Sequence, residues 1–426
     1  MALVVCKFGG TSVATPERVI NVAKRLIAKH RAGDQVVAVV SAMGKTTDDL
    51  LRLAQAVTDD PPSREMDMLL STGEQVSMSV LAMAIDALGC KSVSLTGGQV
   101  GIVTDAVFRK AKIREIKPDR IRMELADDKI VIVAGFQGVT RAGDITTLGR
   151  GGSDTTAVAV AAGLKADRCE IYSDVDGIYT TDPRVCPRAR KLDVISYEEM
   201  LELAASGAGV LQMRAVEFAR HFGVVIECRS AFTDEPGTLV KEVNDKMESA
   251  VVSGIAFDNS EAKVTIRDVP DRVGIAARVF GTIAAAMCNV DMIVQNISED
   301  HYTDLTFTTP IQDLPRLRPI LDEMIENLGA REYIIDESIV KLSIVGAGMK
   351  SNPGIAAKMF QVLADNEVNI SLITTSSIRI SVVIDGDQTQ KAVQKLHTAF
   401  GLDSDKVFEE TQLSGEELAA KMEKGR

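Results

Sequence analysis

Short runs of β-branched and aliphatic residues alternate with helical patterns up to about residue 240. The helical segments, such as Val19–His30 and Met66–Leu88, place apolar residues three and four positions apart. This alternation predicts βαβ units, and therefore an α/β fold with a mostly parallel open sheet and helices on both faces. Ligands of such sheets bind beyond the carboxyl ends of the strands. The strand-like runs are Leu3–Phe8, Val36–Ser41, Ser92–Leu95, Ile130–Ala134, Glu170–Ser173 and Val224–Cys228.

The remainder of the chain repeats itself with an offset of 80 residues. Each copy reads as a strand, a turn, a helix, an Asn-hydrophobic pair and a further strand. We therefore predict two ferredoxin-like βαββαβ modules. Chance similarity between Ala-rich helices is the alternative, but three features share one offset. The matching segments are Gly274–Ala277 and Gly354–Ala357, Phe280 and Phe360, and Asn289-Val290 and Asn369-Ile370.

The formal net charge of the 426-residue chain is −12, from 48 Lys and Arg against 60 Asp and Glu. This balance argues against nucleic acid and anionic membranes as partners, because both would be repelled. A nucleotide remains compatible, since it needs only a few local donors. Aromatic residues make up 4% of the chain and Trp is absent, so aliphatic side chains must fill the cores.

The six cysteines are scattered and form no CxxC pair. This spacing predicts a reduced, cytoplasmic protein without a zinc site. We expect no membrane contact, because no apolar run reaches the roughly 18 residues of a membrane span. The N-terminus enters directly into a strand-like run, so no targeting segment is predicted.

The segment Lys7–Ser12 (KFGGTS) directly follows the first predicted strand. Adjacent glycines let backbone N–H groups approach phosphate oxygens, and Lys7 can supply positive charge to a phosphoryl group in transfer. A Gly-Gly turn alone is more often only a tight turn, and the accompanying Lys7 and Thr11-Ser12 bring the functional interpretation to about even. The nearby Gly44-Lys45-Thr46 resembles the end of a Walker loop, but Val39 stands where that loop requires glycine.

A second glycine-rich segment, Thr147–Thr156, leads into an Ala-rich helical pattern that runs to Ala162. Ser153 or Asp154 is a candidate N-cap of this helix. Capping does not account for Arg150, whose guanidinium can hold a carboxylate through two parallel hydrogen bonds. The N-terminus of the following helix also favours an anion.

A third segment, Ser173–Arg184 (SDVDGIYTTDPR), begins where another predicted strand ends. Its acidic spacing does not match a calcium loop, because the later Glu is missing. Alone, its Asp-Gly and Asp-Pro pairs would indicate only turns. Beside the two preceding motifs, it is a third candidate for function at a strand end.

Together with Ser71–Gln75 (STGEQ), the three segments resemble the aspartate kinases of the amino-acid kinase family, in order and spacing. The resemblance covers the chain except for about the last fifteen residues. It implies transfer of a phosphoryl group from ATP to the side-chain carboxylate of aspartate, the first step of lysine, threonine and methionine biosynthesis. The acceptor is already ionised at neutral pH, so positioning and charge neutralisation suffice. We expect Mg²⁺ to be held mainly through the ATP phosphates, and no protein metal site.

The resemblance also implies residue roles. Lys7 would contact the transferring phosphoryl group, with Asp154 orienting it. Arg150 and Ser153 would hold the aspartate carboxylates. The ammonium end of aspartate would bind Glu74 and Thr47, with Lys45 as a further candidate. Three alternatives stay open: Glu74 as a charge that interacts with the helix dipole, and Lys45 and Arg184 as solvated surface charges. The expected ATP-binding residues are Lys7, Phe8, Gly9, Gly10, Ser41, Ser173, Asp174, Tyr179 and Arg184.

The repeated modules resemble paired ACT modules, which sense amino acids. The resemblance implies inhibition by threonine, and lysine is a further candidate effector. Ser377 stands where relatives carry a glutamate that could pair with the lysine ammonium, so lysine has less support. The predicted effector residues are Asp271, Gly274, Ile275, Ala276, Gln295, Asn369 and Ile370.

The sequence departs from the family pattern at Gly209 as well as at Ser377, and two functions other than aspartate kinase activity remain possible. Gly209 stands where the family usually has a lysine that reaches ATP, and Arg214 is a candidate substitute. Gly209 would favour a catalytically inactive amino-acid sensor, which Lys7 and Arg150 oppose. The other rival is a kinase of the same fold that acts on glutamate or on a nucleotide.

We predict five segments along the chain. Residues 1–245 form the amino-acid kinase domain, and 246–262 form a linker and a strand shared with the second ACT module. Residues 263–337 and 338–411 form the first and second ACT modules, and 412–426 form a tail. A homo-oligomer through ACT pairing is expected, or an α₂β₂ assembly if an internal start near Met247 yields a small subunit.

Overall fold

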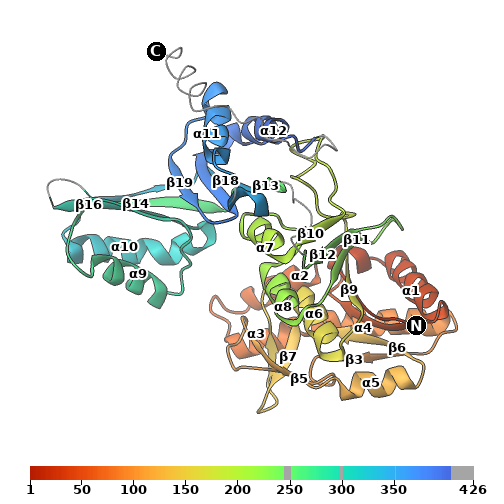
Figure 1. Ribbon diagram of the computed structural model, residues 1–426. Coiled ribbons are helices and arrows are strands. Elements are labelled where there is room, and N and C mark those ends of the chain that lie inside the picture. The colour runs from red at the N-terminus through yellow and green to blue at the C-terminus, as the bar shows by residue number, and fades with distance from the viewer. Residues whose placement is uncertain (244–250, 298–300, 351, 404–426) are drawn as a thin grey trace. The chain divides into compact units, whose positions relative to one another are not determined.

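The computed structural model of the protein describes residues 1–243, 251–297, 301–350 and 352–403 (Figure 1). Met247 and residues 412–426 lie outside the described residues. The chain forms two compact units that interleave along the sequence. The first contains Met1–Asp182, Lys191–Lys246 and Ala256–Glu261, and the second contains Pro183–Arg190, Met247–Ile255 and Ala262–Arg426.

The first unit is built on an eight-stranded sheet in the order β10-β12-β11-β9-β1-β2-β6-β3. Neighbouring strands run parallel except for β11 and β12. The predicted α/β class is therefore confirmed, and each predicted strand run corresponds to a strand, the last one shifted by two residues. The strands are β1 (Leu3–Phe8), β2 (Gln35–Val40), β3 (Ser92–Leu95), β6 (Ile130–Ala134), β9 (Arg168–Ser173), β10 (Val194–Ser196), β11 (Ile226–Ser230) and β12 (Thr238–Lys241).

Side chains of the central strand β1 alternate between the two faces of the sheet. Val4, Cys6 and Phe8 point into an aliphatic core with α1 (Pro16–Arg31) and α4 (Thr72–Ala87). Lys7 lies on the opposite face, where α6 (Gly152–Leu164) packs against β1 and β9. The other helices of this unit are α2 (Thr46–Gln55), α3 (Ser63–Leu70), α5 (Asp119–Ala126), α7 (Tyr197–Ala205) and α8 (Met213–Phe222).

A second, four-stranded sheet in the order β5-β4-β7-β8 was not predicted from the sequence. Its strands have only three or four residues, too few to establish a period of two. The sheet supports the segment that leads from β8 into α6. Its strands are β4 (Ile102–Thr104), β5 (Ile113–Ile116), β7 (Gln137–Thr140) and β8 (Ile145–Thr147).

The segment Ser63–Ala87 is helical, long and apolar enough to cross a membrane by length and composition alone. The prediction that no apolar run reaches this length was therefore wrong. In the structure, α4 packs against α1, β3 and β6, and Leu81 and Ile85 are fully buried there. The apolar character of α4 is explained by its place in the core of the first unit.

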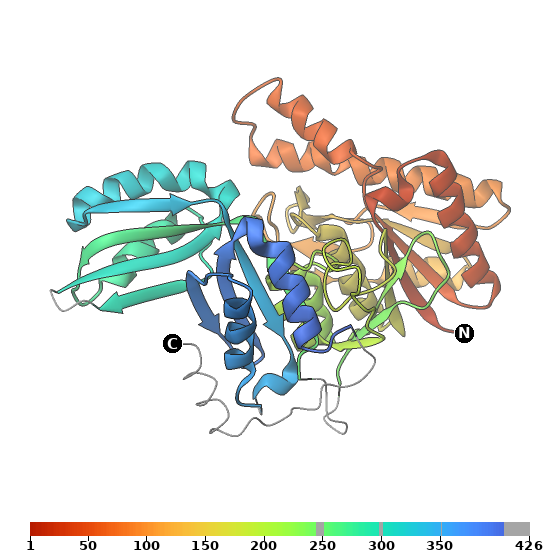
Figure 2. The same cartoon turned by 90° about the horizontal axis from the view of Figure 1, so that it is seen from above.

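Each ACT module in the second unit has one four-stranded antiparallel sheet (Figure 1). In the first module, helices α9 and α10 lie on one face of the sheet β15-β16-β14-β17 (Figure 2). The second has the order β13-β18-β20-β19, so β13, which precedes the first module in sequence, takes the edge position of β17. The elements are β13 (Gly254–Asp258), β14 (Glu261–Pro270), α9 (Ile275–Ala285), β15 (Ile293–Ile297), β16 (Tyr302–Pro310), α10 (Leu314–Leu328), β17 (Glu332–Asp336), β18 (Ile339–Val345), α11 (Ile355–Asp365), β19 (Leu372–Thr375), β20 (Arg379–Asp385) and α12 (Thr389–Ala399).

The predicted repeat is confirmed in detail. The helices α9 and α11 begin 80 residues apart, each preceded by a glycine in the left-handed region, Gly274 at φ 89° and Gly354 at φ 105°. Only glycine adopts this conformation at little cost, which explains why the repeat retains it. The two modules contact each other through Lys341 and Asp291, whose charged atoms are 2.6 Å apart.

Candidate active site

Backbone hydrogen bonds join the loops at the carboxyl ends of β1, β2, β6 and β9. The amide of Gly9 donates to the carbonyl of Tyr172 at 3.3 Å, and Gly44 donates to Gly10 at 3.0 Å. The amide of Gly135, after β6, donates to Val40 at 3.0 Å. These bonds fix the edge at which ligands of a parallel sheet bind.

Two glycines permit the close approach of these loops. A Cβ atom on Gly10 would lie 2.7 Å from the carbonyl oxygen of Ala42, and one on Gly135 would lie 2.7 Å from Oγ of Ser153. Real side chains essentially never come so close, so neither position tolerates a larger residue without movement. Because Gly135 has no side chain, Ser153 in the first turn of α6 can pack directly against the backbone at the end of β6.

Lys7 and Asp154 form an ion pair at this edge, with 2.5 Å between Nζ and a carboxylate oxygen. Their side chains are only 12% and 10% exposed. Lys7 Nζ also lies 3.7 Å from the position that a Cβ on Gly9 would occupy, so the ammonium group is beside the glycine loop. The sequence motifs containing Lys7 and Asp154, about 150 residues apart, therefore meet.

The predicted N-cap of α6 was wrong. Gly151, in the left-handed region at φ 68°, occupies the N-cap position, and no side chain caps the helix. Ser153 and Asp154 instead lie in the first turn. Asp154 pairs with Lys7 rather than with a backbone amide of its own helix. The amide of Gly152 donates to Gly149 at 2.9 Å, so the amides that can face an anion are those of Ser153 and Asp154.

Arg150 precedes α6 in the loop that contains Gly149 and Gly151, both at positive φ. Its side chain is exposed and makes no hydrogen bond or ion pair to the described part of the chain. It stands four residues before Asp154, at the same end of α6. Lys7, from strand β1, and the backbone of Arg150, from the loop before α6, therefore lie at the same end of this helix.

A buried aspartate that the sequence analysis missed supports this loop. Asp67 of α3 is fully buried and accepts hydrogen bonds from the Thr147 amide at 2.8 Å and the Thr147 hydroxyl at 2.6 Å. It also accepts from the amide of Arg109 at 2.9 Å. Its neighbour Glu74 lies in a recognisable motif, but no local pattern distinguishes Asp67 from an ordinary helical charge.

Arg214, considered as a substitute cation for ATP, is engaged elsewhere. Its guanidinium donates to the carbonyl oxygens of Leu148 at 2.9 Å and Ala111 at 2.8 Å. Burial lowers its pKa. This arrangement supports the backbone just before Arg150, so the geometry favours a structural role over phosphate binding. Gly209 is exposed, and a Cβ there would meet no atom within 4 Å.

Glu74, in the first turn of α4, is only 3% exposed. One carboxylate oxygen accepts from the amide of Ala42 at 3.1 Å. The other oxygen is buried without a hydrogen-bond partner among the described residues. Burial raises the pKa of Glu74 to about 7, although the bond from Ala42 opposes this shift. Such a group is ready to accept a cationic donor.

The loop after β2 places the remaining predicted contacts near Glu74. The amide of Ser41 donates to Phe8 at 3.1 Å. Lys45 occupies the N-cap position of α2 and Thr47 lies in its first turn. A Cβ on Gly73 would lie 2.9 Å from Cβ of Ala42, so the loop after β2 and the start of α4 are in close contact.

The third motif begins at Ser173 and Asp174, directly after β9. Its central residue Asp176 accepts from the Tyr179 hydroxyl at 2.8 Å and lies 3.2 Å from Nζ of Lys191. Burial and the bond to Asp176 raise the pKa of Tyr179 to about 12. Arg184 belongs to the segment Pro183–Arg190, which is part of the second unit.

The glycine loop can accommodate phosphate groups. Ser12 Oγ is buried without a hydrogen-bond partner in the described part of the chain, and the ammonium group of Lys7, from the end of β1, lies beside Gly9. No group of three or more His, Cys, Asp or Glu side chains in the described ranges could hold a metal ion.

The predicted effector residues lie in both ACT modules. Residues 271–274 are exposed before α9, whose first residues Ile275 and Ala276 are buried and half-buried, and Gln295 is exposed on β15. Asn369 and Ile370 precede β19. The neighbouring strands meet, because Met292 and Val294 pack with Leu372 in a small cluster. Exposed Ser377 follows β19.

Family profiles match most of the chain. The amino acid kinase family matches residues 2–230, and ACT domains match residues 264–327 and 342–400. An aspartokinase from Mycolicibacterium smegmatis is 53% identical over 410 residues, which is 95% of this chain and 97% of the relative. An aspartokinase from Pseudomonas aeruginosa is 52% identical over 406 residues, covering 95% of this chain and 98% of the relative.

Solved structures show the same similarity. Aspartokinase III of E. coli in complex with aspartate and ADP, described as the R-state, has a TM-score of 0.78 and 26% identity, covering 93% of this chain and 99% of that one. The same enzyme in complex with lysine and aspartate, described as the T-state, has a TM-score of 0.74 and 25% identity, with the same coverage.

Proposed function

Since the chain belongs to the amino acid kinase family, and within it to the aspartokinases, we propose that it phosphorylates the side-chain carboxylate of L-aspartate with ATP. The observation that carries the proposal is the meeting of three strand-end motifs at one edge. There the buried pair Lys7–Asp154 adjoins the N-terminus of α6 and the loop of Arg150.

The nucleotide side uses the glycine loop. Amides of Gly9 and Gly10 approach the phosphate oxygens, and Lys7 neutralises charge that develops on the transferring phosphoryl group. Asp154 keeps the Lys7 ammonium directed to this point. Ser173, Asp174 and Tyr179 contact the nucleoside end. Mg²⁺ enters with ATP as part of the substrate and shields its phosphates.

On the aspartate side, charged side chains complement both the negative and the positive groups of the zwitterionic substrate. Arg150 and Ser153 hold the carboxylates, and the buried Glu74 receives the ammonium group, assisted by Thr47. The reacting carboxylate needs no base, because it is ionised at neutral pH. Its oxygen attacks the γ-phosphorus, the bond to the β,γ-bridging oxygen breaks, and ADP leaves, which yields 4-phospho-L-aspartate.

We further propose threonine as an inhibitor that binds where the ACT modules meet, through Asp271, Gln295 and Asn369. Lysine is a second candidate, since a relative is described in complex with lysine. Serine at position 377 argues for a weaker lysine response. Loss of threonine inhibition is expected in Gln295→Ala, and retained inhibition would contradict this assignment.

Assembly through paired ACT modules is proposed for the full chain. A homo-oligomer would give one polypeptide of 45.8 kDa in every particle, whereas an internal start near Met247 would add a second, smaller subunit. Denaturing gel analysis of the complex purified from its native expression system separates the two outcomes.

The deciding experiment is an assay of ADP release with aspartate, glutamate or no acceptor. We expect turnover with aspartate, and trapping with hydroxylamine should yield aspartyl hydroxamate. Turnover with glutamate alone would favour the related kinase. Binding of amino acids without any turnover would favour the sensor.

A further inference from the structure

The segment Pro183–Arg190 belongs to the regulatory unit, although its two flanks belong to the kinase unit. On the kinase side, its base is closed by a β-bridge between Tyr179 and Lys191 and by the bond from the Leu192 amide to the Ile178 carbonyl at 2.8 Å. Tyr179 and Lys191 also share Asp176. The segment is thus a direct continuation of the nucleotide motif.

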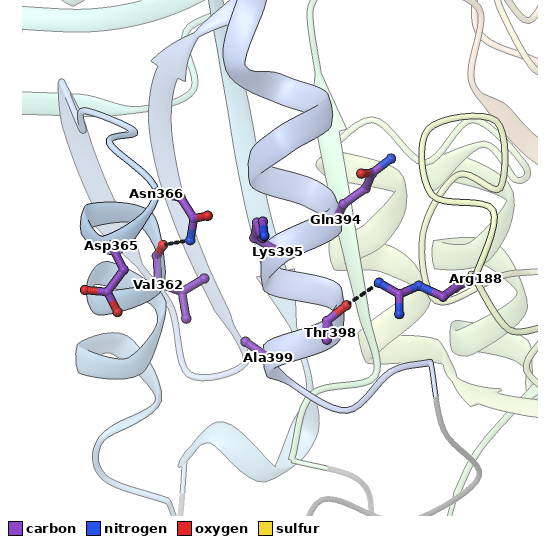
Figure 3. A pocket seen from close by; sticks show the side chains of 8 residues that line it. All are labelled: Arg188, Val362, Asp365, Asn366, Gln394, Lys395, Thr398 and Ala399. Carbon is purple, nitrogen blue, oxygen red and sulfur yellow. Dashed lines mark hydrogen bonds between the residues drawn. The ribbon is translucent and has the colours of Figure 1, made fainter.

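The tip of this segment is held by helix α12 of the second ACT module. Nη2 of Arg188 donates to the hydroxyl of Thr398 at 2.8 Å (Figure 3). Its Nη1 lies 3.2 Å from a carboxylate oxygen of Asp403, just after the end of α12. The side chain of Gln394, one turn earlier on α12, donates to the carbonyl of Val185 at 2.8 Å. Both a side chain and the backbone of the segment are therefore anchored to one helix.

Helix α12 is itself tied to the body of the second module. It packs against α11 and β18, and Val393 and Leu396 are fully buried. A groove of about 380 Å³ remains between α11 and α12, with Arg188 at its border (Figure 3). A shift of α12 within the module would therefore carry the anchors of the segment with it.

We propose that Arg188 and Gln394 are positioning residues for ATP, because they let α12 hold the far end of the nucleotide motif in its binding conformation. The proposal rests on the assignment of Tyr179 and its neighbours to the nucleotide site. Ordering a free loop costs conformational entropy. Hydrogen bonds that anchor the loop before ATP arrives reduce the part of this cost that is subtracted from the binding free energy of ATP. A ligand that moves α12 would then change ATP affinity without touching the active site.

The test compares Arg188→Ala, Gln394→Ala and the double variant with Lys391→Ala, a control at an exposed position of the same helix. ATP binding is measured by calorimetry without aspartate, and hydrogen exchange is measured over residues 183–192. The double variant should bind ATP about tenfold more weakly, and its exchange should be faster, because it loses both contacts of the Arg188 guanidinium and the hydrogen bond from Gln394. Arg188→Lys should recover part of the affinity.

The KM for ATP should rise in parallel, while kcat, the KM for aspartate and the melting temperature stay within about twofold or 2 °C of wild type. Unchanged ATP affinity would overturn the proposal whether or not exchange becomes faster. An equal loss in Lys391→Ala would overturn it as well, since the effect would then be a general property of α12. Wild-type protein that binds ATP without phosphorylating aspartate would instead refute the proposed function and leave this test intact.

Discussion

Two buried glutamates of the kinase unit differ in their partners. Glu170 of β9 is fully buried and accepts hydrogen bonds from Lys29 at 2.9 Å, Arg168 at 2.8 Å and Tyr172 at 2.8 Å. Glu74 is 3% exposed but has one donor, the amide of Ala42. Burial alone would raise both pKa values. The partners of Glu170, Lys29 first, hold its pKa below the ordinary value, whereas that of Glu74 rises to about 7.

The comparison indicates that Glu170 has a structural role, whereas Glu74 is suited to bind a cationic ligand. Glu170 is compensated within the fold. Ionised Glu74 lacks a cationic partner in the described chain, and its raised pKa corresponds to a cost of about 3 kcal/mol at pH 8. The same contrast applies to the cations, since Lys7 is paired with Asp154 and Arg150 is exposed without a partner among the described residues. In the proposed function, the phosphate side is preorganised and bound aspartate would complete the other side.

The largest effect is expected for Lys7→Met on the preorganised side. Removing the only cation that the glycine loop contributes should reduce kcat by about 10³, the magnitude seen when a transition-state donor is lost. Lys24→Met, at an exposed position of α1, should leave kcat unchanged. A loss below tenfold in Lys7→Met would show that the charge of Lys7 is not used in the transfer.

On the side that awaits aspartate, Arg150→Ala should reduce kcat/KM for aspartate by about 10², from the loss of a charged, two-point contact. The affinity for ATP should stay close to wild type, because Lys7 and Asp154 remain. Arg141→Ala, an exposed arginine in the turn between β7 and β8, is the matched control. If Arg150→Ala weakened ATP binding as much as it reduced kcat/KM for aspartate, the proposed division of the site into a phosphate side and an aspartate side would be wrong.

Glu74→Gln should raise the KM for aspartate about tenfold at pH 8 and have little effect at pH 6. The carboxyl group of the free protein is ionised above its pKa of about 7, and only the ionised form attracts an ammonium group. Wild-type affinity should therefore rise between pH 6 and 8, and that rise should disappear in the variant. Asp86→Asn, exposed on the same helix, should retain it.

The stability of the free protein should change in the opposite direction. A carboxyl group with a raised pKa in the folded state favours folding at low pH, so this contribution is lost as pH rises from about 4.5 to about 7. Glu74→Gln should weaken this loss in the free energy of unfolding, as measured by urea titration at pH 5 and pH 8. An unchanged pH dependence would mean that Glu74 is not the group responsible.

The smallest effect is expected for Gly209→Lys, which restores the cation common in the family. A side chain meets no atom within 4 Å of the new Cβ, so we expect an unaltered melting temperature and about threefold tighter ATP binding. Gly207→Lys is the contrasting variant, since its φ of 105° and a Cβ only 2.2 Å from the Phe257 carbonyl should destabilise the fold. Weaker ATP binding in Gly209→Lys would indicate that the position does not face the nucleotide.

Much of the kinase fold followed from the sequence, because buried parallel strands are continuous apolar runs. The central strand Leu3–Phe8 and the strand Ile130–Ala134 have the predicted bounds. The small sheet with β4 and β8 was not predicted, since three-residue strands carry no period. The strand expected within residues 246–262 corresponds to β13 in the second module, but that expectation came from the family resemblance, because pairing between distant segments leaves no local pattern.

Part of the candidate active site could also be predicted, because the positions of the strands could be predicted. Lys7 and Asp154 lie in motifs at strand ends, so topology brings them together. Asp67 and Arg214 were not identified as supports of the Arg150 loop, because their partners are backbone groups of Thr147 and Leu148. The sequence shows which side chains can form hydrogen bonds, but it does not show which backbone carbonyl or amide groups will lie next to them. The pKa of Glu74 likewise depends on burial, which no spacing reveals.

The most direct test is an NMR titration of the Glu74 side chain, labelled with ¹³C and assigned by comparison with Glu74→Gln. In the free protein we expect a pKa near 7. With saturating aspartate, the added ammonium should lower that pKa below its ordinary value, because an opposite charge stabilises the ionised form. A pKa that stays the same with and without aspartate would contradict the assignment of Glu74 to the substrate.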